Sequence, residues 1–145
     1  MHVRNTILAF GLALAACNHA SNDAKPSETT AVAPAAVREV SVSDVENFVK
    51  AKSATIVDAN GAETRQQMGV VPGAVLLTNS HDYALSELPA AKDTKLVFYC
   101  GGTMCRASDS AAKRAASAGY ADVSVMRAGI KGWKDAGQST EMPRS

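Results

Sequence analysis

The sequence has no marked excess of charge of either sign. Its 15 lysines and arginines are balanced by 14 aspartates and glutamates, which leaves a formal net charge of +1, and the charges are scattered along the chain. Domains that bind nucleic acid present a basic patch or stripe that neutralises phosphates. We therefore expect no nucleic acid among the partners of this protein.

Histidine and cysteine are scarce. The chain has three of each, and it contains no C-x-x-C-H sequence of the kind that attaches haem. The histidines are too few and too scattered to complete a zinc site with a pair of cysteines. We expect neither a metal nor an organic cofactor.

Long hydrophobic runs and internal repeats are also missing. The apolar stretch at residues 6–16 follows the positively charged Arg4 and is too short to remain as a membrane-spanning helix. Residues 1–16 instead have the organisation of a signal peptide that is removed.

The signal segment leads directly to a cysteine, in the sequence Leu14-Ala15-Ala16-Cys17. Small residues before a cysteine resemble a bacterial lipobox, which implies that Cys17 is the lipidated first residue of the mature protein and anchors it to a membrane. The next residue is Asn18. By resemblance to Gram-negative lipoproteins, a residue other than aspartate at this position implies an anchor in the outer membrane, on the periplasmic side of the envelope. The alternative is an ordinary secretory signal, cleaved near Ala16 or Ala20.

Residues 17–37 are expected to form a lipid-anchored flexible linker. From Ala20 this segment is rich in alanine, serine, threonine and proline and has few large apolar side chains, so it cannot bury enough surface to fold. Residues 38–143 remain, which is close to the usual size of one domain with a single core.

Short apolar segments alternate with helical patterns along this domain. The predicted strands are 40–42, 55–58, 74–77, 95–99 and 123–126. The first predicted helix starts at Ser43, which has capping-box spacing to Glu46. The other predicted helices are 62–68, a short helix with Leu85 and Leu88, 107–118, and a last short helix with Ile130 and Trp133. Such alternation is typical of an α/β fold with a parallel sheet, helices on both faces and right-handed crossovers.

The strand predicted at 95–99 ends at Cys100, and a glycine-rich loop then leads into an alanine-rich helix. The backbone N–H groups of such a loop and of the first helical turn can converge on an anion. The same field favours the thiolate form of a cysteine, which is its nucleophilic form. In open parallel sheets, sites lie at the carboxyl ends of strands. We therefore predict that Cys100 is a catalytic nucleophile in an anion cradle formed by Gly101, Gly102, Thr103, Met104, Cys105 and Arg106.

Two residues of the predicted cradle have alternative interpretations. Cys105 is either a resolving thiol that attacks a persulfide, sulfenate or mixed disulfide on Cys100, or a small side chain that fills the loop. Arg106 follows Cys100 at C-x5-R spacing. It either grips an oxyanion with two hydrogen bonds or is a solvated residue of the first helical turn.

Four residues outside the loop also have expected roles. Asp58, at the end of the strand at 55–58, should anchor the neighbouring loop by accepting backbone N–H bonds. We expect His81 and Arg127 at the surface. Trp133 should pack the last helix as a core or rim residue.

Four sequence blocks together resemble those of the rhodanese-like domain, and the resemblance covers nearly all of residues 40–141. The blocks are Ile56-Val57-Asp58, then Gly69-Val70-Val71-Pro72-Gly73-Ala74, then Val97-Phe98-Tyr99-Cys100 with its loop, and finally Gly119-Tyr120-Ala121-Asp122-Val123 with Ala128-Gly129-Ile130-Lys131-Gly132-Trp133 and Ala136-Gly137. The resemblance implies a single rhodanese-like domain with sulfurtransferase activity. In that activity Cys100 takes sulfane sulfur from thiosulfate or a persulfide donor, holds it as a persulfide and passes it to a thiophilic acceptor.

The chain departs from the family pattern at several positions. Val70 stands where the family often has histidine, and Asn60 stands where many members have arginine. The loop after Cys100 is longer than the usual sulfurtransferase loop and contains the second cysteine, Cys105. Similar long loops with Cys-Gly-Gly and a further cysteine occur in a subgroup of rhodanese-like domains.

Three other functions fit the same residues. The first is thiol–disulfide redox chemistry by Cys100 and Cys105. The second is an oxyanion enzyme that uses Arg106, because rhodanese-fold phosphatases and arsenate reductases have similar C-x5-R spacing, although Tyr99 replaces their usual histidine. The third is a non-catalytic tethered binding module. A fold alone does not choose among these functions, and the sequence identifies no protein partner.

Overall fold

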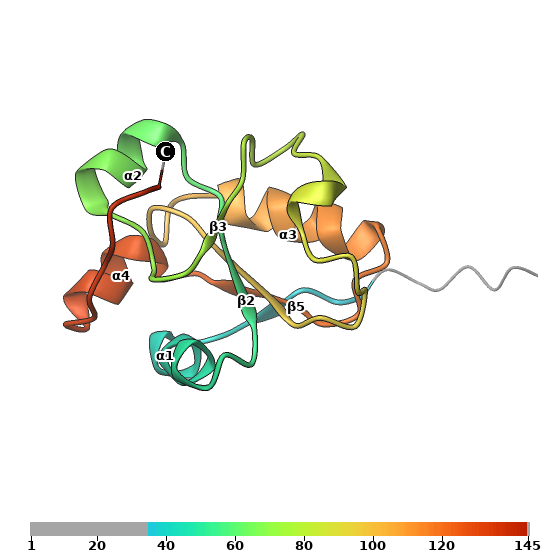
Figure 1. Cartoon of the computed structure of the whole chain (residues 1–145), viewed down its shortest axis with the longest axis horizontal. Coiled ribbons are helices and arrows are strands. Elements are labelled where there is room, and N and C mark those ends of the chain that lie inside the picture. The colour runs from blue at the N-terminus through green and yellow to red at the C-terminus, as the bar shows by residue number, and fades with distance from the viewer. Residues whose placement is uncertain (1–34, 145) are drawn as a thin grey trace, which may run out of the picture. The chain divides into compact units, whose positions relative to one another are not determined.

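The computed structural model describes residues 35–144, so the predicted signal peptide, Cys17 and most of the predicted linker lie outside the described residues. The described chain forms an α/β fold with one five-stranded sheet in the order β1-β5-β4-β2-β3 (Figure 1). The elements are β1 Arg38–Glu39, α1 Val42–Ala51, β2 Thr55–Asp58, α2 Ala62–Met68, β3 Val75–Leu76, the 3-10 helix η1 Leu85–Glu87, β4 Leu96–Tyr99, α3 Ala107–Ser117, β5 Val123–Met126 and α4 Gly129–Asp135.

All neighbouring strands of the sheet run parallel, as predicted. Side chains alternate between the two faces of each strand. On β4, Leu96 and Phe98 belong to the hydrophobic cluster that contains the alanines of α3. Val97 and Tyr99 belong to the opposite cluster, which contains residues of α1 and α4. Helices therefore cover both faces of the sheet, with α3 on one side and α1 on the other (Figure 1).

Several predicted boundaries are confirmed and others are displaced. The segments 55–58, 62–68 and 123–126 have the predicted types and bounds, whereas the predicted strand 74–77 is only Val75–Leu76. The helix predicted at 107–118 ends at Ser117, and Ala118 is its C-cap. The short helix around Leu85 is a 3-10 turn of three residues.

The predicted start of the first helix at Ser43 is wrong, because the N-cap is Ser41. The Ser41 hydroxyl accepts the Asp44 N–H at 3.1 Å, and the Asp44 carboxylate accepts the Ser41 N–H at 2.9 Å. This is a capping box with aspartate in the third helical position. The strand predicted at 40–42 is also wrong, because the edge strand is Arg38–Glu39 and Val42 begins the helix. The Val40 N–H still donates to the Val125 carbonyl at 3.0 Å.

This topology puts β4 in the middle of the sheet, and Cys100 follows it directly. The carboxyl ends of parallel strands meet at one edge, so the ends of β2 and β5 flank the end of β4. No helix within residues 35–144 is long and apolar enough to cross a membrane.

Candidate functional site

The sulfur atoms of Cys100 and Cys105 are joined in a disulfide, which the sequence left open. The Cα atoms of the two cysteines lie 6.2 Å apart, within the usual range for such a bond. Cys100 is 2% exposed, whereas Cys105 is only partly buried. The structure therefore shows the oxidised state of the pair, in which Cys100 has no free thiol.

The loop after Cys100 closes on itself as a turn. The Cys105 N–H donates to the Gly102 carbonyl at 2.9 Å, so this N–H of the predicted anion cradle is used within the loop. Thr103 and Met104 at the tip are exposed, and Met104 as a residue is 91% exposed. An open, shallow depression is lined by Gly101, Gly102, Thr103, Met104, Cys105 and Lys131.

Helix α4 fixes the first half of this loop. The Ile130 N–H donates to the Cys100 carbonyl at 2.8 Å, and the Lys131 N–H donates to the Gly101 carbonyl at 3.0 Å. Gly129, the first residue of α4, has a φ of +64°. A Cβ on Gly129 would overlap the Cys100 carbonyl oxygen and would lie 2.5 Å from the Gly102 nitrogen. Gly129 has no separate role that its sequence position predicts, because this approach joins the loop after β4 to the helix after β5.

We expect Gly129→Ala to destabilise the domain and to displace the Cys100 loop. The positive φ should cost about 1–2 kcal/mol, and the overlap with the loop backbone should add about 1–3 kcal/mol. Gly137→Ala is the matched control, since Gly137 has a φ of +77° and residues 35–144 place no atom within 4 Å of an added Cβ there. Urea unfolding measures both variants, and equal losses of unfolding free energy would contradict the close approach.

Besides Cys105, the side chain of Ser108 also contacts the Cys100 sulfur. Its Oγ lies 3.3 Å from Cys100 Sγ, and the residue is 2% exposed in the first turn of α3. The disulfide sulfur has no hydrogen, so the Ser108 hydroxyl is the donor in this state. Ser108 was not foreseen from the sequence, although a hydroxyl in the first turn of the helix after a nucleophile loop is a usable signal.

The Arg106 side chain is directed to Asp109 and does not line the depression at the Cys100 loop. Arg106 is the N-cap residue of α3, its side chain is 73% exposed, and its Nη1 lies 3.3 Å from Asp109 Oδ2. This position matches the second interpretation of Arg106, a solvated residue of the first helical turn.

Arg127 has more partners than a simple surface residue. It donates to both carboxylate oxygens of Asp109 at 2.9 Å and to Glu39 at 3.1 Å. Hydrogen bonding by Arg127 lowers the pKa of Asp109 despite partial burial of that carboxyl. Arg127 therefore ties the first turn of α3 to the ends of β5 and β1.

A buried polar network leads to the residue before Cys100 and centres on Asp58, which is 0% exposed. The Asp58 carboxylate accepts the Asn60 N–H at 2.6 Å, the Tyr99 hydroxyl at 2.5 Å and the Arg65 Nε at 3.3 Å. Accepting the Asn60 N–H is the kind of loop contact expected for Asp58. Tyr99 and Arg65 were not foreseen as its partners.

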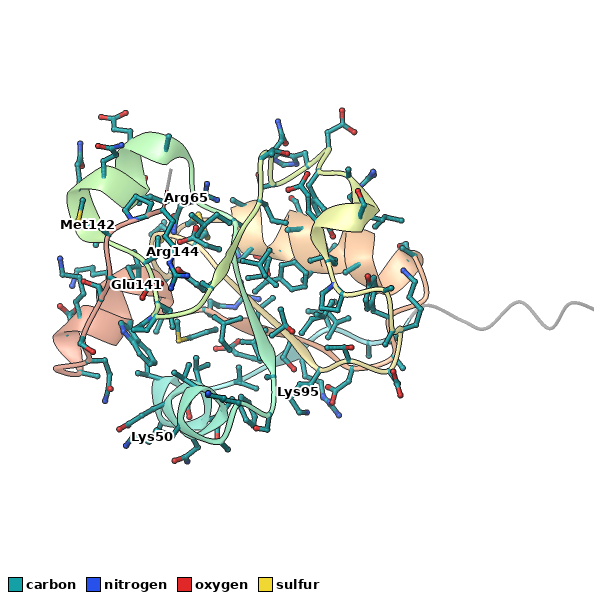
Figure 2. The ribbon with its side chains drawn as sticks, viewed as in Figure 1. Lys50, Arg65, Lys95, Glu141, Met142 and Arg144 are labelled. Carbon is teal, nitrogen blue, oxygen red and sulfur yellow. A yellow bond between two sulfur atoms is a disulfide. The ribbon has the colours of Figure 1, made fainter. Side chains whose placement is uncertain are left out.

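The same network connects four segments. Arg65 extends from α2 (Figure 2) and donates through Nη2 to the carbonyls of Asp58 and Leu77, both at 2.9 Å. The Tyr99 hydroxyl accepts the Val71 N–H at 3.0 Å. Burial and the neighbouring Asp58 charge raise the pKa of Tyr99 far above its ordinary value. The phenol therefore stays protonated and holds the segment before Cys100 in place.

Asn60 is buried beside the start of the loop. It is 8% exposed, and its Nδ2 has no hydrogen-bond partner among residues 35–144. A Cβ built on Gly101 would lie 3.8 Å from the Asn60 Oδ1. An unpaired buried donor is costly, so this amide is a polar group beside the loop whose donor still lacks a partner among the described residues.

The remaining predicted residues have simple environments. His81 is exposed, as expected. Trp133 is 2% exposed in the α4 core and donates its indole N–H to the Ser139 carbonyl at 2.7 Å. Within residues 35–144 no group of three or more histidine, cysteine, aspartate or glutamate side chains is placed to hold a metal ion.

Comparisons with known proteins agree with this architecture. The family model described as the rhodanese-like domain matches residues 41–136. The comparison with curated proteins gives no match. A structure titled as a protein of unknown function and possible tyrosine phosphatase, from Rhodopseudomonas palustris, has 25% identity and a TM-score of 0.60, covering 72% of this chain and 85% of that one.

Two further structures are titled as sulfurtransferases. A thiosulfate sulfurtransferase from Pseudomonas aeruginosa has 20% identity and a TM-score of 0.58, covering 75% of this chain and 21% of that chain. A human single-domain sulfurtransferase has 18% identity and a TM-score of 0.55, covering 69% and 97%. These likenesses support the fold. The family match over most of the described residues shows that the chain belongs to the rhodanese-like domain family.

Proposed function

We propose that the chain is a sulfurtransferase in which Cys100 carries sulfane sulfur as a persulfide. The observation that carries this proposal is the place of Cys100, directly after the middle strand of a rhodanese-like domain and before the first turn of α3. Sulfurtransferases among the similar structures support the same reaction class. The substrate is a small sulfur-containing anion or a persulfide donor.

The reaction starts from the reduced pair. The Cys100 thiolate attacks the outer sulfur of thiosulfate, the sulfur–sulfur bond of thiosulfate breaks, and sulfite leaves with the bonding electrons. A persulfide then remains on Cys100. A thiophilic acceptor attacks its outer sulfur, and Cys100 leaves as a thiolate. The Ser108 hydroxyl, 3.3 Å from Cys100 Sγ, donates to the thiolate in both half-reactions.

Backbone and side-chain donors would hold the substrate anion. The N–H groups at the start of α3 follow the Cys100 loop directly, and the Asn60 amide, whose Nδ2 has no partner within residues 35–144, lies near Gly101. Arg106 contacts Asp109 at 3.3 Å and its side chain is 73% exposed, so it is not preorganised for a bidentate grip on a phosphate or arsenate. This geometry favours sulfur transfer over phosphatase or arsenate reductase chemistry.

Parallel assays of the reduced chain test this choice. We expect cyanide-dependent sulfite release from thiosulfate, with no turnover of an aryl phosphate or arsenate. Turnover of the aryl phosphate or arsenate without sulfite release would favour the oxyanion enzyme. Silence in all assays would favour a tethered binding module.

Lipidation of Cys17 is a second part of the proposal and rests on the Leu14-Ala15-Ala16-Cys17 motif. One acyl chain binds a membrane only marginally, so several chains are needed to hold a lipoprotein. We expect Cys17→Ser to move the protein from the membrane fraction, on the periplasmic side of the outer membrane, into the soluble periplasm. A soluble wild-type protein without added lipid mass would contradict the lipobox interpretation.

A further inference from the structure

Cys105 lies close enough to Cys100 for its sulfur to bond to the Cys100 sulfur. Resting on the proposed function, we infer that Cys105 resolves the Cys100 persulfide within the chain and releases sulfide. The protein is then a dithiol-dependent thiosulfate reductase, and it needs no external acceptor for the sulfane sulfur. Its partner is a dithiol reductant.

The fold holds the two sulfur atoms together. The Cα atoms are 6.2 Å apart, and the turn closed by the Cys105 N–H and the Gly102 carbonyl brings the chain back toward Cys100. The hydrogen bonds from Ile130 and Lys131 hold the other side of this turn. A thiol tethered in this way has a high effective concentration compared with a thiol in solution.

The bond in the structure is the product that attack on the inner sulfur of the persulfide would give. Attack on the outer sulfur of the persulfide would move that sulfur to Cys105. Attack on the inner sulfur joins the two Sγ atoms, and this is the bond that the structure contains. The Cys105 thiolate bonds to Cys100 Sγ, the bond between the inner and outer sulfur breaks, and the outer sulfur leaves as hydrosulfide with the electron pair.

The burial of the pair indicates how it is reduced again. Cys100 is 2% exposed and Cys105 is partly exposed. A reductant thiolate therefore attacks Cys105 and forms a mixed disulfide there, while Cys100 leaves as a thiolate beside the Ser108 hydroxyl. The second thiol of the reductant then frees Cys105. Thiosulfate and the dithiol are converted to sulfite, hydrogen sulfide and the reductant disulfide, which balances atoms and electrons.

A single-turnover experiment tests this inference. The full 145-residue chain carries Cys17→Ser, so that only Cys100 and Cys105 remain. It is reduced with dithiothreitol, freed of reductant without air, and mixed with one equivalent of thiosulfate. Sulfite, sulfide and intact mass are measured, and the matched control also carries Cys105→Ser.

We expect the background chain to release one equivalent each of sulfite and sulfide and to lose the mass of two hydrogens. Once the persulfide has formed, its conversion to sulfide should be first order, with a rate constant independent of protein concentration. The Cys105→Ser chain should release sulfite, gain one sulfur atom and lose sulfide release. Dithiothreitol should restore repeated turnover to the background chain.

Two results would overturn the inference. In the first, the background chain keeps the added sulfur and releases sulfite without sulfide, which leaves the proposed sulfurtransferase intact. In the second, the rate constant for sulfide release from the formed persulfide rises with protein concentration, which shows transfer between chains. Absence of sulfite from both chains would instead contradict the proposed function itself, and the inference with it.

Discussion

Cys100→Ser is expected to lower thiosulfate-dependent sulfite release at least about a thousandfold, the order of loss caused by removing a covalent nucleophile. The serine hydroxyl is not ionised near neutral pH, and it cannot form a persulfide. The fold should change little, because the substitution nearly preserves the volume of a residue that is 2% exposed. Sulfite release by the reduced chain is the measurement.

Cys105→Ser is the matched control for this loss. It also removes the disulfide, but it leaves the proposed nucleophile in place, so sulfite should still be released in the first turnover. If both variants lose sulfite release equally, both thiols are needed for the first step, and Cys100 is not distinguished as the nucleophile. If Cys100→Ser retains it, Cys100 is not the nucleophile.

Arg65→Met is expected to lower the free energy of unfolding by about 3 kcal/mol, the lower end of the range for breaking a buried charged pair. The Asp58 side chain is 0% exposed and would lose its cationic partner. The carbonyls of Asp58 and Leu77 would lose the donor they share. Urea unfolding of the reduced chain measures the change.

Arg106→Met is the control for this second prediction. The Arg106 side chain is 73% exposed, and it contacts Asp109 at 3.3 Å. An exposed pair of this kind contributes at most about 1 kcal/mol. Similar losses of unfolding free energy in the two variants would show that the Asp58 network adds no particular stability.

The regular elements were predictable because their patterns are local. The apolar run at Thr55–Asp58 and the helix at Ala62–Met68 appear where expected, since Asn60 and Gly61 separate them. The first helix was misplaced because Ser41 and Ser43 both offer capping-box spacing. Only the hydrogen bonds between Ser41 and Asp44 decide between them.

The candidate site was predictable at Cys100, but most of its partners were not. The end of an apolar strand before two glycines is visible in the sequence. The Tyr99 contact with Asp58 joins residues 41 positions apart, and the Gly129 approach depends on how α4 meets the loop. The disulfide depends on the bend of the loop. These contacts follow from tertiary structure, which residue spacing does not encode.

The most direct test of the central claim is covalent capture of the sulfur on Cys100. The full chain with Cys17→Ser and Cys105→Ser is reduced and incubated with thiosulfate radiolabelled in its outer sulfur. We predict one bound label per chain, located on the peptide that contains Cys100 and released by cyanide as thiocyanate. A chain that stays unlabelled, or a label that remains after Cys100→Ser, would contradict the account.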